Sequence, residues 1–214
     1  MKTFETLIIM EVNSYYHVFN KGNNGETIFF ERANYVYFLK QYDRYLTPYV
    51  ATFAYCLMPN YFHLLLKVLP QANENDQTSK VLETFEVLVV APKPTLTSVQ
   101  KAFKDFFISY AKSINKKYQR TGSLFQYKFK RKAVDTDAYF VKLAHYIHYN
   151  PIKASLCKHY EDWEFSSYRA LISDKPTKLQ RDEVLRWFGG REQFIAYHQQ
   201  VIVNEHALQG VLVD

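Results

Sequence analysis

The sequence contains no apolar run long enough to cross a membrane. A spanning helix needs ~18–20 consecutive apolar residues, and the 214-residue chain has no such run. The first residues, MKTFETLIIMEVNSYY, carry a short apolar patch that Glu5 and Glu11 interrupt, and no small-residue cleavage site follows. We therefore expect a cytoplasmic protein that has no membrane partner.

Closely spaced cysteines and internal repeats are absent as well. The two cysteines, Cys56 and Cys157, lie far apart in the sequence and form no CxxC pair. This excludes a CxxC site and favours two structural thiols in a reducing compartment.

Apolar and aromatic residues are abundant. The chain is 48% hydrophobic, which is enough for the core of one ordinary domain and argues against a disordered protein. It has 18 tyrosines and 17 phenylalanines, and 27 basic against 21 acidic residues give a net charge of +6. Aromatic side chains mostly pack cores but also stack on bases. The composition is therefore compatible with nucleic-acid binding without requiring it.

Apolar periodicity and turn residues predict four strands and three main helices. The strands are expected at residues 14–22, 50–57, 61–68 and 125–134. The helices are expected at residues 30–46, from Thr95 or Thr97 onward to the turn at 121–123, and at 136–150, where Pro151 stops the last one. The order β-α-β-β-α-β-α predicts an α+β fold, a ferredoxin-like sandwich. It has an antiparallel four-stranded sheet with helices on one face, followed by extra C-terminal helices.

We expect one domain over residues 1–172 and a helical C-terminal tail over residues 173–214. Within the domain, the polar stretch PQANENDQTSK begins a loop insertion at about residues 70–94. The following VLETFEVLVV is ambiguous between helix and strand.

Two elements carry candidate site residues. In the strand at 61–68, Tyr61 and His63 share one face because side chains alternate along a strand. In the helix at 136–150, Tyr139, Tyr146 and Asn150 lie on one face. A tyrosine hydroxyl has an ordinary pKa of about 10 and acts in phosphoryl transfer when a metal ion assists. The alternative is that both faces are ordinary core, which is common for a single strand histidine and for tyrosines on an apolar helix.

A row of basic residues marks a third candidate. Lys128, Lys130 and Lys132 alternate in the strand at 125–134, with Arg131 on the other face. Side chains ~7 Å apart along a strand match the repeated phosphates of a nucleic acid. Lysines of the helix near residues 95–120, including Lys101 and Lys104, could extend the same surface. The alternative is a solvated edge strand that charge protects from pairing.

Five segments, in this order, resemble one known family: YHVFNKGN, YCLMPNYFHLLLKV, TGSLFQYKFKRKAV, YIHYNP and WEFSSYRAL. They are similar to the single-tyrosine transposases of the HUH superfamily, and specifically to the REP-associated tyrosine transposases. The resemblance covers roughly residues 14–172. It implies a ferredoxin-like fold and the cleavage of single-stranded DNA beside hairpins through a 5′-phosphotyrosine, which a 3′-hydroxyl later attacks to rejoin strands.

The resemblance also assigns roles to individual residues. The family motif Met-Pro-Asn-His-x-His, whose histidines bind Mg²⁺ or Mn²⁺, places the second metal ligand at His63. Its first histidine is replaced here by Tyr61, so weak metal binding is expected. Tyr146 corresponds to the nucleophile and Asn150 to a third metal ligand. His17, on the neighbouring strand, could supply an imidazole if it faces the same way.

Three hypotheses remain open at this level. The first is an active DNA transposase that uses Tyr146 with a metal ion at His63 and Asn150. The second is a catalytically impaired, domesticated transposase that binds hairpin or single-stranded DNA through its lysines. The third is a basic domain whose motifs are coincidental. The first two imply a DNA partner and no small-molecule substrate, and the family includes both monomers and homodimers.

Overall fold

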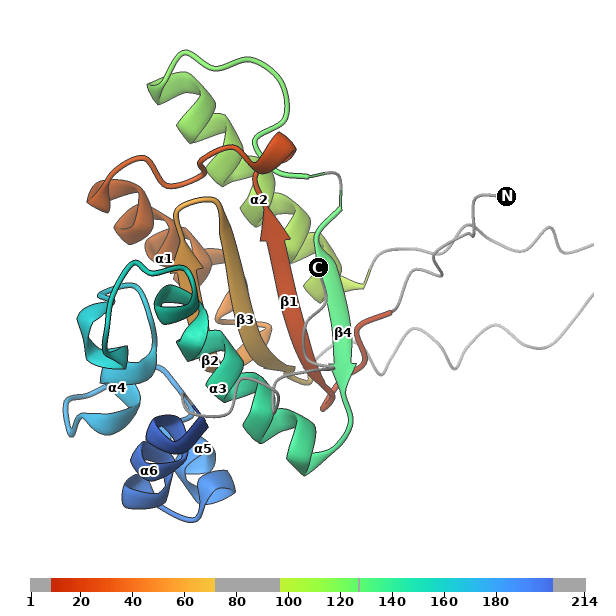
Figure 1. The fold of residues 1–214 in the computed structure, drawn as a ribbon. Coiled ribbons are helices and arrows are strands. Elements are labelled where there is room, and N and C mark those ends of the chain that lie inside the picture. Colours follow the sequence, from red (N-terminus) through yellow and green to blue (C-terminus); the bar gives the residue numbers. More distant parts are fainter. Residues whose placement is uncertain (1–8, 72–96, 127, 202–214) are drawn as a thin grey trace, which may run out of the picture.

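The computed structural model describes residues 9–71, 97–126 and 128–201. Their centre is one four-stranded sheet with the strand order β2-β3-β1-β4, in which all neighbouring strands are antiparallel (Figure 1). The strands are β1 (Tyr15–Lys21), β2 (Val50–Met58), β3 (Tyr61–Val68) and β4 (Lys130–Val134). The predicted α+β class and ferredoxin-like strand order are confirmed.

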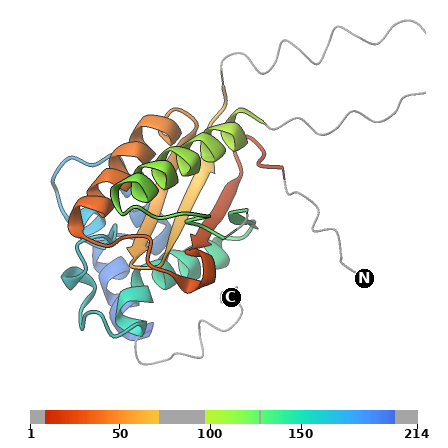
Figure 2. The same cartoon turned by 90° about the horizontal axis from the view of Figure 1, so that it is seen from above.

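Helices cover both faces of the sheet. On one face, α1 (Arg32–Leu46) and α2 (Ser98–Lys117) lie side by side, as Figure 2 shows. These are the two helices of the ferredoxin-like core, and they share one face as predicted. The other face carries α3 (Asp137–Lys153), α4 (Tyr168–Ile172), α5 (Arg181–Phe188) and α6 (Arg191–Val201). Short 3₁₀ turns occur at Asn23–Gly25 and Tyr160–Asp162.

Side chains of β3 alternate between the two faces of the sheet, so the strand contributes to two separate cores. Phe62, Leu64 and Leu66 are buried against α1 and α2. Leu65 is buried in a second cluster with residues of α3 to α6. Because strand side chains alternate between faces, Tyr61 and His63 lie on the same side of the sheet as Leu65 and α3.

Threonine side chains cap the starts of α2 and α3. Thr97 caps α2 by accepting a hydrogen bond from the Gln100 main-chain N–H at 3.4 Å. Thr136 caps α3 in the same way through the Tyr139 N–H, at 3.2 Å. The predicted stop at Pro151 is wrong, because α3 continues to Lys153 with Pro151 inside its last turn. A proline there removes one main-chain donor but does not prevent the final residues from staying helical.

The predicted strand at residues 125–134 is too long. β4 begins only at Lys130, and Lys128 has a left-handed backbone with φ of 67°. Phe125 forms an isolated bridge to Gly22, and Tyr127 lies outside the described residues. A left-handed residue cannot continue the strand alternation, so Lys128 does not join Lys130 and Lys132 on one strand face.

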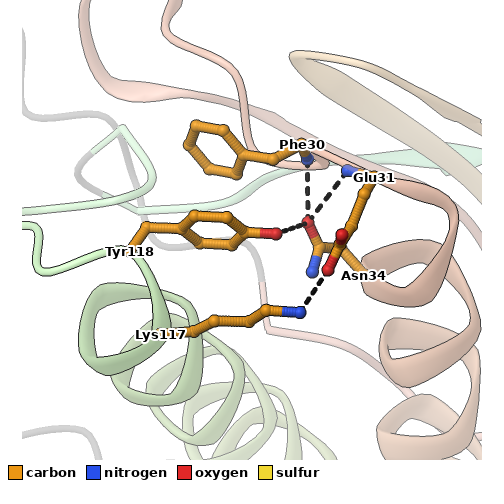
Figure 3. Close-up of polar contacts among 5 residues, drawn as sticks. All are labelled: Phe30, Glu31, Asn34, Lys117 and Tyr118. Carbon is orange, nitrogen blue, oxygen red and sulfur yellow. Dashed lines mark hydrogen bonds and ion pairs between the residues drawn. The ribbon is translucent and has the colours of Figure 1, made fainter.

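One buried asparagine joins α1 to α2, as Figure 3 shows. The Asn34 Oδ1 atom accepts hydrogen bonds from the Phe30 N–H at 2.9 Å, the Glu31 N–H at 3.2 Å and the Tyr118 hydroxyl at 3.0 Å. Lys117 pairs with Glu31 beside it. A single oxygen atom thus accepts hydrogen bonds from two main-chain donors at the start of α1 and from one hydroxyl at the end of α2.

A chain of hydrogen bonds joins α3 to α6. The His198 Nδ1 atom lies 2.8 Å from the Phe194 carbonyl, an acceptor, so this nitrogen carries the hydrogen. The His198 Nε2 atom therefore accepts from His148 Nδ1, 2.9 Å away. His148 Nε2 in turn accepts from the Ser167 hydroxyl at 2.8 Å. Both imidazoles are buried and neutral, and each ring nitrogen has a partner.

The segment after residue 172 packs onto the domain. Val184 and Phe194 are fully buried in the cluster that contains α3. The Tyr15 hydroxyl donates to Glu183 at 2.6 Å, and Lys178 pairs with Asp43 at 2.7 Å. The predicted loop insertion at about 70–94 lies almost wholly outside the described residues. Among the helices that are described, none is long and apolar enough to cross a membrane.

Candidate DNA-binding and cleavage site

The strand and helix candidates meet in space. On β3, Tyr61 and His63 point toward α3, and their rings contact edge to face with centroids 5.4 Å apart. The His63 ring also meets the Tyr146 ring edge to face at 5.3 Å. The Tyr61 hydroxyl donates to Asn150 Oδ1 at 3.2 Å. Four residues from two distant segments therefore form one site.

The orientation of the Asn150 side chain is fixed from within α3. Its Nδ2 group donates to the Tyr146 carbonyl at 2.7 Å, one helical turn earlier. The amide is buried, so this bond turns Oδ1 toward Tyr61. Asn150 thus presents its oxygen atom to the site, but that oxygen already accepts the hydroxyl of Tyr61.

His17 belongs to the same site. It lies on β1, where Phe19 is the direct partner of His63 and His17 is the partner of Leu65. The His17 Nε2 atom is 2.8 Å from His63 Nδ1, and the two rings stack with centroids 5.0 Å apart. From the sequence, His17 could supply an imidazole only if its side chain faced the site, and the structure shows that it does face His63.

Both imidazoles are neutral near pH 7. Burial lowers the pKa of His63 from 6.5 to about 3. The pKa of His17 lies well below its usual value because of burial first, and then the charges of His63 and Lys132.

Two cations border the site. Lys130 pairs with Phe19 and Lys132 pairs with His17 across the β1–β4 ladder, so both side chains lie on the α3 face of the sheet. The Lys132 ammonium lies 4.8 Å from the centre of the Tyr139 ring, and the Lys130 ammonium lies 5.9 Å from the Phe19 ring. Both residues are exposed.

The other predicted basic residues lie elsewhere. The Arg131 guanidinium lies 5.2 Å from the Phe129 ring, and the alternation of β4 directs it to the face that α2 covers. Lys101 and Lys104 are exposed residues of α2, in the layer on that opposite face. The predicted row of three lysines is therefore a pair, with Lys128 before the strand.

The residues present do not fit a firmly held Mg²⁺ or Mn²⁺ ion. The site offers His63, the Asn150 oxygen and phenols, and hydrogen bonds join His63 to His17, Tyr61 to Asn150 and Asn150 to the Tyr146 carbonyl. One His63 nitrogen is taken by His17, and the Asn150 oxygen is taken by Tyr61. No group of three or more His, Cys, Asp or Glu side chains in the described ranges could hold a metal ion. Hard cations prefer oxygen ligands, and binding sites for them usually include carboxylates.

Sequence reasoning did not predict that Phe19 lies opposite His63 or that His17 forms a hydrogen bond with His63. The strand order predicted that β1 and β3 are neighbours. The register that sets Phe19 opposite His63 has no signature in the sequence.

Comparison with known proteins gives one structural match. No family model matches the chain, and no curated protein matches it. A solved structure of a REP-associated tyrosine transposase bound to a REP hairpin superposes with a TM-score of 0.56 at 14% sequence identity, over 80% of this chain and 88% of that one. The chain therefore has the fold of a REP-associated tyrosine transposase.

Proposed function

We propose that this protein binds hairpin or single-stranded DNA on the α3 face of its sheet, beside β4. The observation that carries the proposal is the position of Lys130 and Lys132, which border the site formed by Tyr61, His63 and Tyr146. Ammonium groups on a strand next to a polar site suit a phosphate backbone. The matched transposase was solved with a DNA hairpin, which supports this choice of partner.

The test is hairpin binding measured by fluorescence anisotropy at several salt concentrations. The double variant Lys130→Ala/Lys132→Ala should bind more weakly and should lower the slope of log affinity against log salt by about 1.5, because each lost phosphate contact removes ~0.7–0.9. The matched control is Lys101→Ala/Lys104→Ala, which removes the same charge from α2. Equal losses in the two variants, or a larger loss in the control, would contradict the proposed face.

A second candidate function is cleavage of single-stranded DNA by Tyr146. The observation in its favour is that the Tyr146 ring contacts His63 and that Asn150 lies one helical turn away. In this reaction the tyrosine oxygen attacks phosphorus and forms a 5′-phosphotyrosine. The bond to the 3′ oxygen breaks, and the released 3′-hydroxyl takes up the proton. A later attack by a 3′-hydroxyl would complete strand transfer.

Denaturing gels of the protein with hairpin DNA and Mn²⁺ test this candidate. Cleavage predicts a covalent adduct that disappears in Tyr146→Phe. Restoring the second imidazole by Tyr61→His should increase adduct formation, because the variant replaces a neutral phenol by a metal ligand. An adduct that persists in Tyr146→Phe, or none in either the parent protein or Tyr61→His, rules out this chemistry.

A further inference from the structure

We propose that the Tyr61–His63 site binds a DNA phosphate oxygen directly, with Tyr61 and His63 as hydrogen-bond donors in the place of a divalent ion. The inference deepens the proposed DNA binding, on which it rests, by naming the chemical group that enters the site. It follows from the hydrogen positions on the two histidines and from the charges around them.

The buried environment of His17 decides which nitrogen carries each hydrogen. His17 Nε2 faces His63 Nδ1 at 2.8 Å, so exactly one of these two atoms donates. The other nitrogen of His17, Nδ1, is buried and has no hydrogen-bond partner among the described residues. If His63 donated, His17 Nδ1 would have to carry an unpaired, buried N–H. Among buried main-chain groups, orphaned N–H donors are rarer than under-satisfied acceptors, and we apply the same preference to this ring.

The favoured arrangement is therefore donation from His17 to His63. The hydrogen lies on His17 Nε2, and His63 Nδ1 accepts it with its lone pair. A neutral His63 then carries its own hydrogen on Nε2, at the ring edge turned away from His17. A ring nitrogen that bears a hydrogen is a donor and cannot ligate a metal ion.

The surroundings of this donor favour an anion. The Tyr61 hydroxyl is a second donor, which now satisfies the neutral oxygen of Asn150 at 3.2 Å and could donate to a stronger acceptor. Lys130 and Lys132 supply positive charge on the same face. Bonds from such donors to a charged oxygen are stronger than bonds to a neutral one. Two donors and two cations match the oxygen of a phosphodiester.

The primary experiment is ¹⁵N nuclear magnetic resonance of the histidine rings in the full chain, with EDTA present. We expect His63 to be neutral with its hydrogen on Nε2, and this signal to shift when hairpin DNA is added. Inorganic phosphate, at higher concentration, should cause a similar shift if the site recognises phosphate itself. Finding the hydrogen on His63 Nδ1, or no shift with either probe, would overturn the inference.

Two further measurements separate this inference from the DNA proposal. Mn²⁺ added without DNA should not selectively broaden the signals of His63. Selective broadening would show that a metal ion binds at the site and would overturn the inference. Tyr61→Phe should weaken metal-free hairpin binding about 10- to 100-fold, the value of one hydrogen bond to a charged group, and Tyr45→Phe on α1 is the matched control. Unchanged binding in Tyr61→Phe refutes its role. If hairpins fail to bind while phosphate still shifts His63, the DNA proposal fails and the phosphate site stands.

Discussion

At the scale of the residue, Tyr61 changes the chemistry of the site without disturbing its construction. The phenol stands at the position that the sequence resemblance assigns to a metal ligand, yet it lies on the α3 face and reaches Asn150 with its hydroxyl. It thereby fills the acceptor that a metal ion would use. A hydrogen bond thus joins Tyr61 to Asn150 where an imidazole would offer a metal ligand, while the Tyr146 ring lies against His63.

Asn34 is the residue for which a stability change is most directly predicted. Asn34→Ala should lower the free energy of unfolding by about 2–3 kcal/mol, because it removes the acceptor of two main-chain N–H groups and the Tyr118 hydroxyl. Asn34→Asp keeps an oxygen at the same place and should retain most of the stability. Urea unfolding followed by circular dichroism measures both, and an Asp variant as unstable as the Ala variant would contradict the role of this oxygen.

At the scale of the element, sequence patterns within one strand or helix correctly predicted which of its side chains share a face. The period of two in residues 61–68 and the spacing of Tyr146 and Asn150 fixed which side chains share a face. The start of β4 could not be read from the alternating sequence at 125–134. There, Phe125 bridges to Gly22 and Lys128 has a left-handed backbone, and the bridge joins segments that are distant in the sequence.

The site shows the same division between local and distant determinants. Tyr61 with His63, and Tyr146 with Asn150, could each be paired by spacing within one element. The contact between His17 and His63 depends on the β1–β3 register, which aligns Phe19 with His63. A shift of one residue would turn His17 to the other face. No pattern within either strand specifies that alignment. The contact of His17 with His63 could therefore be identified only from the structure.

At the scale of the whole molecule, the α3 side of the protein is built on buried, uncharged imidazoles. Five of the six histidines in the part of the chain that the structure describes are buried: His17, His63, His145, His148 and His198. Two lie under the proposed DNA site, and three lie between α3, α6 and their neighbours. The same face therefore carries both the candidate site and the groups whose protonation would disrupt its support.

This arrangement predicts that the protein loses stability in mild acid. Burial lowers the pKa of His148 from 6.5 to about 3 and that of His145 to about 4. Between pH 6.5 and 4 the unfolded chain therefore binds more protons than the folded one, so stability falls as pH falls, by up to about 1.4 kcal/mol per pH unit for each such histidine. Above pH 7 both states are neutral at these positions and the dependence should disappear.

Urea unfolding at a series of pH values from 7.5 to 4.5 measures this dependence. His148→Gln removes one titrating group and keeps an amide that can hydrogen-bond, so its stability should fall less steeply with acidification, even if it is less stable at pH 7.5. His159→Gln, at an exposed histidine, is the matched control. A parent slope near zero over this range, or equal slopes in the parent and His148→Gln, would show that these imidazoles do not control acid stability. The expected result would show that α6 stays packed on α3 only while the histidines in the hydrogen-bond chain from Ser167 to Phe194 are neutral.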